Sequence, residues 1–251
     1  RKAGLNELGF DLIYGLPLQT CADLARTIRL ATELKPSRIA LFGYAHVPWF
    51  KRRQRLINAE TLPGAGERFD QAELARRMLG DLGYESIGLD HFALPGDPLA
   101  AAARNRSLHR NFQGYVATES DAMVGFGPSA ISRFPAGYAQ NISTIGAWRH
   151  AVEAGTLPVA RGHVLDIEDL RRRAIVQSIM CSLEVDLAPW GGWDMFPDAY
   201  AELGPLAAAG IVEISGEALK VPSPMRQFSR LAAMAFDAYA SHSSTPHSRA
   251  I

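Results

Sequence analysis

The residues best suited to chemistry gather where four apolar runs of this sequence end. These ends are rich in Gly, His, Asp or Ser, residue types that turn the backbone, form hydrogen bonds or exchange protons. The carboxyl ends of parallel strands meet along one side of a sheet or barrel, and ligands bind there. The sequence therefore predicts one site assembled from four strand ends, at Tyr14–Pro17, Gly43–His46, Asp90–Ala93 and Gly125–Ala130.

The stretch His109–Tyr115 concentrates side-chain donors, two aromatic rings and a glycine. Arg110 can form a bidentate pair with a carboxylate, and Phe112 or Tyr115 can pack against a ring. This composition is typical of a site for a planar ligand that carries carboxylates. An exposed, solvated loop is the alternative, and composition alone leaves both open.

Asp11 stands inside an apolar run, Phe10–Gly15, that reads as a strand. We expect its carboxylate to be buried, and a buried carboxylate without a partner is costly. The sequence therefore predicts a partner for Asp11: an arginine in a structural ion pair, backbone donors or the hydroxyl groups of a ligand.

Three histidines, His46, His91 and His109, follow strands or lie in loops. A metal site is conceivable, and a hydrolase that activates a metal-bound water with His46, His91 and Asp90 is one hypothesis. Their spacing has no His-x-His or His-x-x-x-His form, so ordinary loop or core histidines are the plainer interpretation.

The chain has two cysteines, Cys21 and Cys181, which cannot form a disulfide framework. On their own they also cannot hold a zinc ion or an iron–sulfur cluster. Cys21 falls at an expected helix start, where a thiol pKa tends to fall. The sequence offers no base beside it, so we expect a plain buried cysteine and a protein of the reducing cytoplasm.

Composition excludes several other classes of protein. The 251 residues include 26 Lys and Arg against 26 Asp and Glu, a formal net charge of zero. This balance argues against a nucleic-acid partner. No apolar run of about 18 residues is present, so we expect no membrane-spanning helix, and the first residues show no secretion leader.

The first part of the chain alternates strands with helices. This alternation predicts βαβ units and a parallel sheet. Four strands are too few for a closed eight-stranded barrel, so we expect an α/β fold whose residues 1–141 form a partial (β/α) barrel. The expected strands are Phe10–Gly15, Arg38–Tyr44, Ser86–Phe92 and Ala122–Phe126, and the expected helices are Cys21–Leu34, Gly66–Leu82 and Leu99–Arg106.

Residues 142–241 show a different pattern and predict a mainly helical C-terminal domain. A hairpin, Ile211–Ile214 with Ala218–Val221, precedes the last helix, an arrangement that is winged-helix-like. No helix is basic enough to argue for DNA binding. Residues 242–251 are rich in Ser, Pro and His and predict a disordered tail. The expected helices are Thr144–Ala154, Ile167–Leu183, Pro197–Ala209 and Met225–Ser241.

Several motifs together resemble a known family. The chain is similar to the C-terminal portion of oxygen-independent coproporphyrinogen III oxidase (dehydrogenase), a radical S-adenosylmethionine enzyme of haem biosynthesis. The first motif is shared with a related haem chaperone, the alternative family, whereas Asp90–Ala93 and His109–Tyr115 are more specific to the oxidase. The motifs are Phe10–Pro17, Tyr44–His46, Gly88–Ala93, His109–Tyr115, Gly127–Ser132 and Tyr138–Asn141.

The resemblance implies a fold, a reaction and cofactors. The family fold is a partial (β/α) barrel followed by a helical domain. A [4Fe–4S] cluster and two S-adenosylmethionine molecules serve a radical reaction that converts two propionates of coproporphyrinogen III to vinyl groups. By motif match, Asp11 would bind an S-adenosylmethionine ribose, and Ile13, Ala45 and Ile131 would line the nucleoside pockets.

The same resemblance places Phe112 and Gln113 beside the second S-adenosylmethionine. Chemistry, rather than motif match, suggests that His109 and Arg110 meet the carboxylates of the substrate. No catalytic residue and no metal ligand is assigned within this sequence.

One departure from the family is decisive for activity. The family holds its cluster by a Cys-x-x-x-Cys-x-x-Cys motif, and this sequence has none. We therefore expect the cluster-bearing strands to lie upstream, the chain alone to be inactive, and the exposed edge of its partial barrel to favour self-association. The full-length enzyme would also need an electron donor for its cluster.

Overall fold

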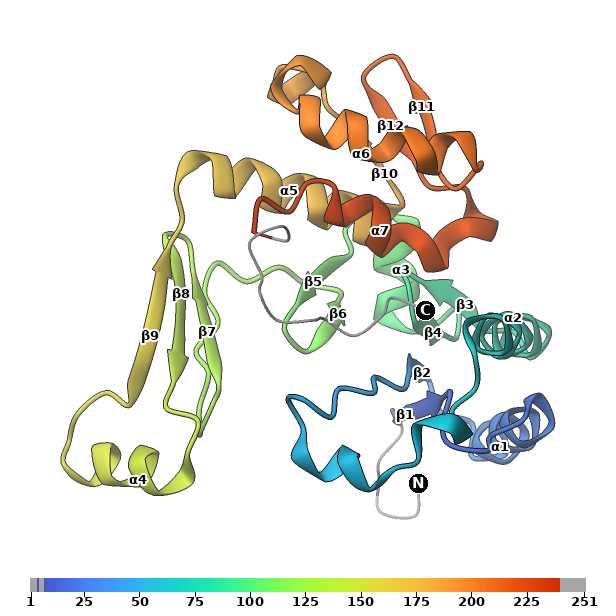
Figure 1. Ribbon diagram of the computed structural model, residues 1–251, viewed down its shortest axis with the longest axis horizontal. Coiled ribbons are helices and arrows are strands. Elements are labelled where there is room, and N and C mark those ends of the chain that lie inside the picture. The colour runs from blue at the N-terminus through green and yellow to red at the C-terminus, as the bar shows by residue number, and fades with distance from the viewer. Residues whose placement is uncertain (1–3, 5–6, 240–251) are drawn as a thin grey trace.

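The computed structural model describes residue 4 and residues 7–239. A four-stranded sheet has the order β1-β2-β4-β3 (Figure 1). Strands β1 (Gly9–Tyr14) and β2 (Arg38–Gly43) are parallel and are connected by helix α1 (Cys21–Glu33). Strand β4 (His91–Ala93) runs antiparallel to β2, and β3 (Glu85–Ile87) runs antiparallel to β4.

The prediction of a parallel sheet is therefore correct only for the first pair of strands. The apolar run Ser86–Phe92 is a hairpin rather than one strand, because Gly88 takes a left-handed conformation with φ of +54° and turns the chain. This turn returns the chain beside β2 without the crossover helix that a parallel neighbour requires.

Helices α1 and α2 (Ala65–Asp81) cover one face of the sheet. The α1 N-terminus has the expected capping box, in which Thr20 and Asp23 bond to each other's backbone N–H. The residues buried between sheet and helices include Leu24, Ile28, Ile39, Leu41, Ala75, Leu79 and Phe92.

The other face of the sheet is open at β1. Asp11 is exposed, Ile13 is 46% exposed and Phe42 is 37% exposed. The expectation of a buried Asp11 is therefore wrong: β1 is an edge strand, and its alternation directs Phe10, Leu12 and Tyr14 toward the helices instead.

A second apolar cluster joins the β3–β4 hairpin to helix α3 (Pro98–Arg104) and to a two-stranded hairpin of β5 (His109–Asn111) and β6 (Gly114–Val116). Asp97 caps α3 as expected, accepting from the Leu99 N–H, and also pairs with Arg38 at 3.0 Å. Two short 3₁₀ turns, Arg52–Leu56 and Ala59–Thr61, lie between β2 and α2.

A three-stranded antiparallel sheet extends away from this body as an arm (Figure 1). Its strands are β7 (Ile131–Phe134), β8 (Gly137–Asn141) and β9 (Val159–Val164), and helix α4 (Ile145–Glu153) lies between β8 and β9. The sequence pattern does not predict these strands, because the arm is largely exposed and lacks an apolar face. The expected strand Ala122–Phe126 is wrong: it forms a single bridge, from Met123 to Arg133.

The last part of the described chain packs around its own core. Helix α5 (Ile167–Ser182) leads into an antiparallel sheet of order β10-β12-β11, formed by β10 (Glu184–Asp186), β11 (Glu213–Ser215) and β12 (Ala218–Lys220). Helix α6 (Pro197–Ala208) follows two 3₁₀ turns, Ala188–Trp190 and Trp193–Met195. The predicted hairpin and helix positions hold to within a few residues.

The final helix is shorter than expected. A 3₁₀ segment, η5 (Ser223–Phe228), leads into α7 (Ser229–Met234), and the chain then turns so that Phe236 is fully buried. Residues 240 and 241 of the expected helix and the expected tail 242–251 lie outside the described residues.

Substituting Gly88 tests how tightly the β3–β4 turn is packed. A Cβ at Gly88 would overlap the Tyr115 ring, and the positive φ disfavours any side chain. We expect Gly88→Ala to lower the free energy of unfolding by about 3 kcal/mol in urea denaturation.

Gly80→Ala is the matched control for this substitution. Gly80 lies near the end of α2, where an added Cβ meets nothing within 4 Å. The control should be neutral or stabilising by up to about 1 kcal/mol. Equal stability of Gly88→Ala and the unsubstituted chain would contradict the close approach of Tyr115.

Candidate functional site

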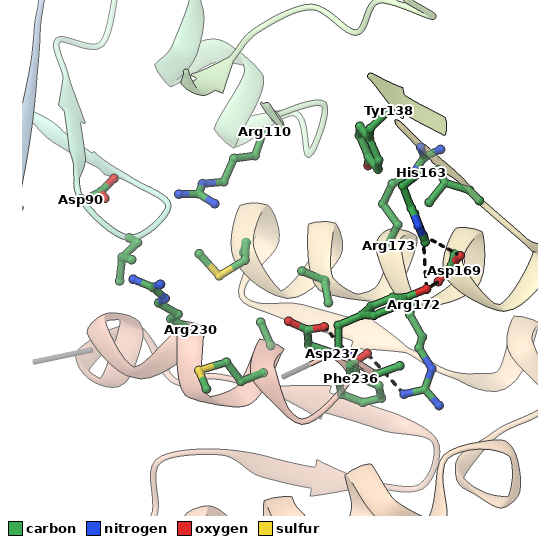
Figure 2. Close-up of a pocket in the computed structure, with 18 residues that line it drawn as sticks. Asp90, Arg110, Tyr138, His163, Asp169, Arg172, Arg173, Arg230, Phe236 and Asp237 are labelled. Atoms are coloured by element: carbon green, nitrogen blue, oxygen red, sulfur yellow. Dashed lines mark hydrogen bonds and ion pairs between the residues drawn. The ribbon is translucent and has the colours of Figure 1, made fainter. Parts of the chain in front are cut away.

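A cavity of about 620 Å³ lies between α5, α7, the β5–β6 hairpin and the arm (Figure 2). Helix α5 supplies one face of it, because residues 169, 172, 173, 176 and 180 recur at helical spacing. The cavity is lined by Leu89, Asp90, Arg110, Tyr138, His163, Leu165, Asp169, Arg172, Arg173, Val176, Met180, Arg230, Ala233, Met234 and Phe236–Tyr239.

Four arginines line this cavity, and they differ in how well they are neutralised. Arg172 is paired with Glu168, whose Oε1 lies 2.8 Å from the Arg172 Nε, and it packs over the Phe196 ring. Arg173 has its Nη1 buried without a hydrogen-bond partner. Arg110 lies over the Tyr115 ring, and Figure 2 shows Arg110 and Arg230 directed into the cavity.

An apolar surface lies between these charges. Val176, Met180, Ala233, Met234 and Phe236 all contribute to the lining. An apolar cavity with a few convergent cations suits a flat hydrophobic ligand that bears carboxylates. Of the stretch His109–Tyr115, Arg110 contributes to this lining, and most of the walls come from α5 and α7.

A hydrogen-bonded cluster of His163, Asp169 and Tyr239 closes one side of the cavity. The Tyr239 hydroxyl donates to the Asp169 Oδ1 at 2.8 Å, and the His163 Nε2 lies 3.4 Å from the Asp169 Oδ2. The Asp166 backbone N–H and the Tyr239 hydroxyl, with a smaller effect of His163, hold the pKa of Asp169 below its ordinary value. The cluster fastens β9 to the start of α5.

A neighbouring cavity of about 270 Å³ shares Arg110, Tyr138, Arg173, Val176 and Met180 with the large one. Phe112 also lines it and meets Tyr138 edge to face, with ring centroids 5.5 Å apart. The Arg133 Nε, on another part of this wall, is buried without a partner. Arg173 and Arg133, which line these cavities, therefore each carry a buried guanidinium nitrogen without a hydrogen-bond partner.

The predicted substrate residues His109 and Arg110 separate in the structure. Arg110 lines the large cavity, whereas His109 lines a smaller one of about 240 Å³ that Arg110 also reaches. His109 is held there by Gln177, 2.8 Å from its Nδ1, and lies 3.8 Å from the Glu119 carboxylate.

Three of the four predicted strand ends meet. The Tyr44 N–H donates to the Tyr14 carbonyl, and the Leu41 N–H donates to the Asp90 carbonyl, each at 2.8 Å. Asp90 reaches this side of the sheet through the hairpin turn rather than through a parallel strand. Residues 125–130 are instead bound to the arm, where the Asn141 Nδ2 donates to the Gly127 carbonyl at 2.9 Å.

The residues predicted to line nucleoside pockets fall on two parts of the molecule. Asp11 and Ile13 lie on the open face of the sheet, and Ala45 follows β2, where its carbonyl accepts from Gln54 at 2.9 Å. Ile131 begins β7, and Phe112 and Gln113 form the exposed turn between β5 and β6.

The histidines form no metal centre within the described residues, where no three His, Cys, Asp or Glu side chains gather to hold an ion. His91 binds Asp90, with 2.6 Å between its Nδ1 and the Asp90 Oδ1. His46 lies 3.4 Å from the Tyr44 hydroxyl. The hypothesis of a metal-dependent hydrolase built on His46, His91 and Asp90 is therefore not supported.

The two cysteines lie in different environments. Cys21 is exposed at the start of α1, so the expectation that it is buried is wrong: the apolar face of α1 begins at Leu24. Cys181 is buried, and this burial raises the pKa of its thiol to about 12. The thiols of this chain do not fit the ligand set of an iron–sulfur cluster, which needs several thiolates together.

Similarity to known proteins extends along the whole chain. It is 42% identical over 256 aligned residues to an oxygen-independent coproporphyrinogen III oxidase of Bradyrhizobium diazoefficiens, covering 100% of this chain and 57% of the relative. An enzyme of the same name from Escherichia coli is 38% identical over 245 residues, covering 95% of this chain and 54% of the relative. No protein-family model matches.

The chain is homologous to the oxygen-independent coproporphyrinogen III oxidases. A solved structure described as coproporphyrinogen III oxidase from Escherichia coli, a radical SAM enzyme, superposes with a TM-score of 0.88 at 36% identity. The superposition covers 56% of that enzyme's chain and 95% of this chain. The predicted resemblance and the α/β class are thus confirmed, and the chain spans about half the length of these oxidases.

Sequence reasoning missed most residues of the large cavity, notably Arg173, Arg230, His163 and Asp169. The sequence did carry a signal for Arg173. Three consecutive arginines, Arg171–Arg173, stand in helix α5, where half of the residues are apolar, so at least one of them must point toward the interior.

Within the described residues, no helix is both long and apolar enough to cross a membrane.

The Asp169 cluster predicts a dependence of stability on pH. Its folded pKa lies below the ordinary value of about 4, so the ionised carboxylate stabilises the fold above that pH. This stabilisation is lost as the pH falls through the folded pKa. We expect the melting temperature of Asp169→Asn to fall less steeply than that of the unsubstituted chain between about pH 5 and pH 2.5.

Asp70→Asn serves as the control for this titration. Asp70 is exposed on α2 and has no hydrogen bond or ion pair within the described part of the chain. Its acid-side slope should match that of the unsubstituted chain. Parallel slopes for all three proteins would show that the cluster does not contribute.

Proposed function

We propose that this chain is the C-terminal portion of an oxygen-independent coproporphyrinogen III oxidase. The full-length enzyme would convert two propionates of coproporphyrinogen III to vinyl groups and give protoporphyrinogen IX. Homology over the whole chain, with about half of each relative covered, is the observation that carries the proposal. The described geometry supports it through a cavity of suitable size and charge.

The proposed architecture divides the chain as the sequence suggests. Residues 1–141 would belong to a partial (β/α) barrel, residues 142–241 to a helical, winged-helix-like domain, and residues 242–251 to a disordered tail. The exposed edge of β1 and the exposed side chains of Ile13 and Phe42 favour self-association of the isolated chain. Two free cysteines suit a cytoplasmic enzyme.

The large cavity is our candidate for the tetrapyrrole site. Each propionate would lose one hydrogen atom, one electron and CO₂, leaving a vinyl group, so the remaining carboxylates must be held away from the reacting carbon. Arg110, Arg173 and Arg230 present guanidinium groups for this purpose. Val176 and Met180 would pack against the apolar macrocycle and exclude water.

The open face of β1 is our candidate for part of a nucleoside site. Asp11 presents an exposed carboxylate beside the exposed Ile13, a pairing that suits ribose hydroxyls next to an apolar ring. Ala45, Ile131, Phe112 and Gln113 would contribute the remaining contacts proposed for two S-adenosylmethionine molecules. Bound S-adenosylmethionine with a reduced [4Fe–4S] cluster supplies the radical chemistry; no step through the cluster is assigned to this chain.

A chimera tests the proposed activity. This chain would replace the matching part of the Escherichia coli relative, and anaerobic conversion of coproporphyrinogen III would be followed by porphyrin fluorescence. We expect turnover, and we expect Arg110→Ala to lower kcat/KM by about tenfold or more, because a charged hydrogen bond to a carboxylate is lost.

Arg106→Ala is the matched control in the chimera. Arg106 is close in sequence but pairs with Glu184, with 2.6 Å between its Nη1 and the Glu184 Oε1, outside the cavity. Its kcat/KM should change less than about twofold. A folded, cluster-loaded chimera without turnover would overturn the proposal, and tight haem binding in its place would favour the haem chaperone.

The isolated chain should lack the radical reaction. Its thiols do not fit a cluster, so reconstitution with iron and sulfide should leave less than about one iron in ten chains. S-adenosylmethionine cleavage should be absent under reducing conditions, as measured by chromatography of the nucleoside products. The Escherichia coli relative treated identically is the positive control, and robust cleavage by the isolated chain would refute this expectation.

A further inference from the structure

A further cavity of about 190 Å³ lies where α2 faces η5 and α7. It meets the large cavity at Leu89, Asp90 and Arg230, which line both. The Phe69 and Phe228 rings stack with centroids 6.2 Å apart and hold η5 against α2. The volume equals that of about six water molecules, which is room for a small anion and too little for a nucleotide.

Four guanidinium groups converge on this cavity, from Arg68 and Arg76 of α2, Arg226 of η5 and Arg230 of α7. Among the described residues, only two carboxylates line it. Glu73 is engaged by Arg76, whose Nη2 lies 2.9 Å away, and Asp90 is engaged by His91. Positive charge therefore exceeds negative charge, and both carboxylates already have partners.

Two donors in the wall have no partner. The Arg68 Nε and the Gln227 Nε2 are buried without a hydrogen bond. A buried, unsatisfied donor is costly, and a charged one more so. Both residues line this cavity, so an acceptor bound there could satisfy the two donors.

Arg226, unlike Arg68, has partners for its guanidinium nitrogens, and its Nη2 donates to the Ser223 hydroxyl at 3.3 Å. Its hydrogen bonds to the Gly88 and Ser223 carbonyls are long, at 3.3 and 3.4 Å. Burial, followed by the nearby charge of Arg76, lowers the pKa of its guanidinium. A bound anion would offset both effects.

The backbone makes room for this arrangement. A Cβ at Gly43 would lie 2.9 Å from the Arg68 Nη2 and 3.1 Å from the Tyr14 hydroxyl. Gly43 therefore allows the guanidinium of Arg68 to approach the carboxyl end of β2. The three strand ends that meet in the structure thus form one wall of the cavity.

We propose that this cavity is an oxyanion site in which Arg68, Arg226, Arg230 and Gln227 bind a carboxylate or an equivalent small oxyanion. Two sources share this chemistry: a propionate that reaches across Leu89 and Asp90 from a tetrapyrrole in the large cavity, and a free oxyanion. The first source rests on the proposed function, and the second does not.

Inorganic phosphate is the first probe, titrated calorimetrically into the full chain at constant ionic strength maintained with chloride. We expect saturable one-to-one binding. Arg68→Gln and Arg226→Gln should each raise Kd by about tenfold or more, because each removes a charged donor. Circular dichroism confirms that the variants are folded.

Arg77→Gln is the matched control, since Arg77 is exposed on the same helix and lies outside the cavity. Its Kd should change less than about twofold. No phosphate binding by the unsubstituted chain, or equal Kd values in all four proteins, overturns the proposal.

Coproporphyrin III, a stable tetracarboxylate, distinguishes the two sources through its fluorescence on binding. Competition by phosphate, with weaker porphyrin binding in Arg68→Gln, identifies a propionate as the occupant. Phosphate binding without competition identifies a free oxyanion. If the unsubstituted chain binds phosphate but does not bind coproporphyrin III, the result would count against the proposed function and leave the oxyanion site in place.

Discussion

One buried hydroxyl connects three parts of this molecule. The Tyr115 Oη donates to the Met180 carbonyl on α5 at 2.9 Å and accepts from the Leu89 N–H in the β3–β4 turn at 3.0 Å. Burial is the main reason that the pKa of Tyr115 is raised, so the hydroxyl stays protonated and keeps its donor. Gly88 and His91 pack against the same ring, and Leu89 and Asp90 are thereby fixed between the two cavities.

Local sequence signals predicted local structure well. The Thr20–Asp23 capping box and the Asp97 cap mark helix starts because a single side chain satisfies the free backbone donors. The direction of a strand has no such signal. The run Ser86–Phe92 is apolar in a parallel strand or a hairpin alike, and the left-handed Gly88 decides between them.

Some residues of the candidate site could likewise be predicted from local sequence, and others could not. Arg110 was predictable because its neighbours combine donors with rings, and it lines the cavity. The exposure of Asp11 was not predictable, since the pattern of a strand does not reveal whether a sheet face is covered. His163 and Asp169 are close in the sequence, but their partner Tyr239 is 70 residues from Asp169, and only the tertiary fold brings it to them.

The arm is joined to α5 by a very short connection. Strand β9 ends at Val164 and α5 begins at Ile167, while every residue of β9 is exposed. The His163 Nε2 and the Asp169 Oδ2 lie 3.4 Å apart across this junction. Because displacement grows with distance from a pivot, a small rotation at residues 165–166 would carry α4 much farther than it moves the wall of the cavity. The His163–Asp169 contact and the Phe112–Tyr138 ring pair both hold the arm close to its attached end, so the far end of the arm would report any opening of the cavity most sensitively.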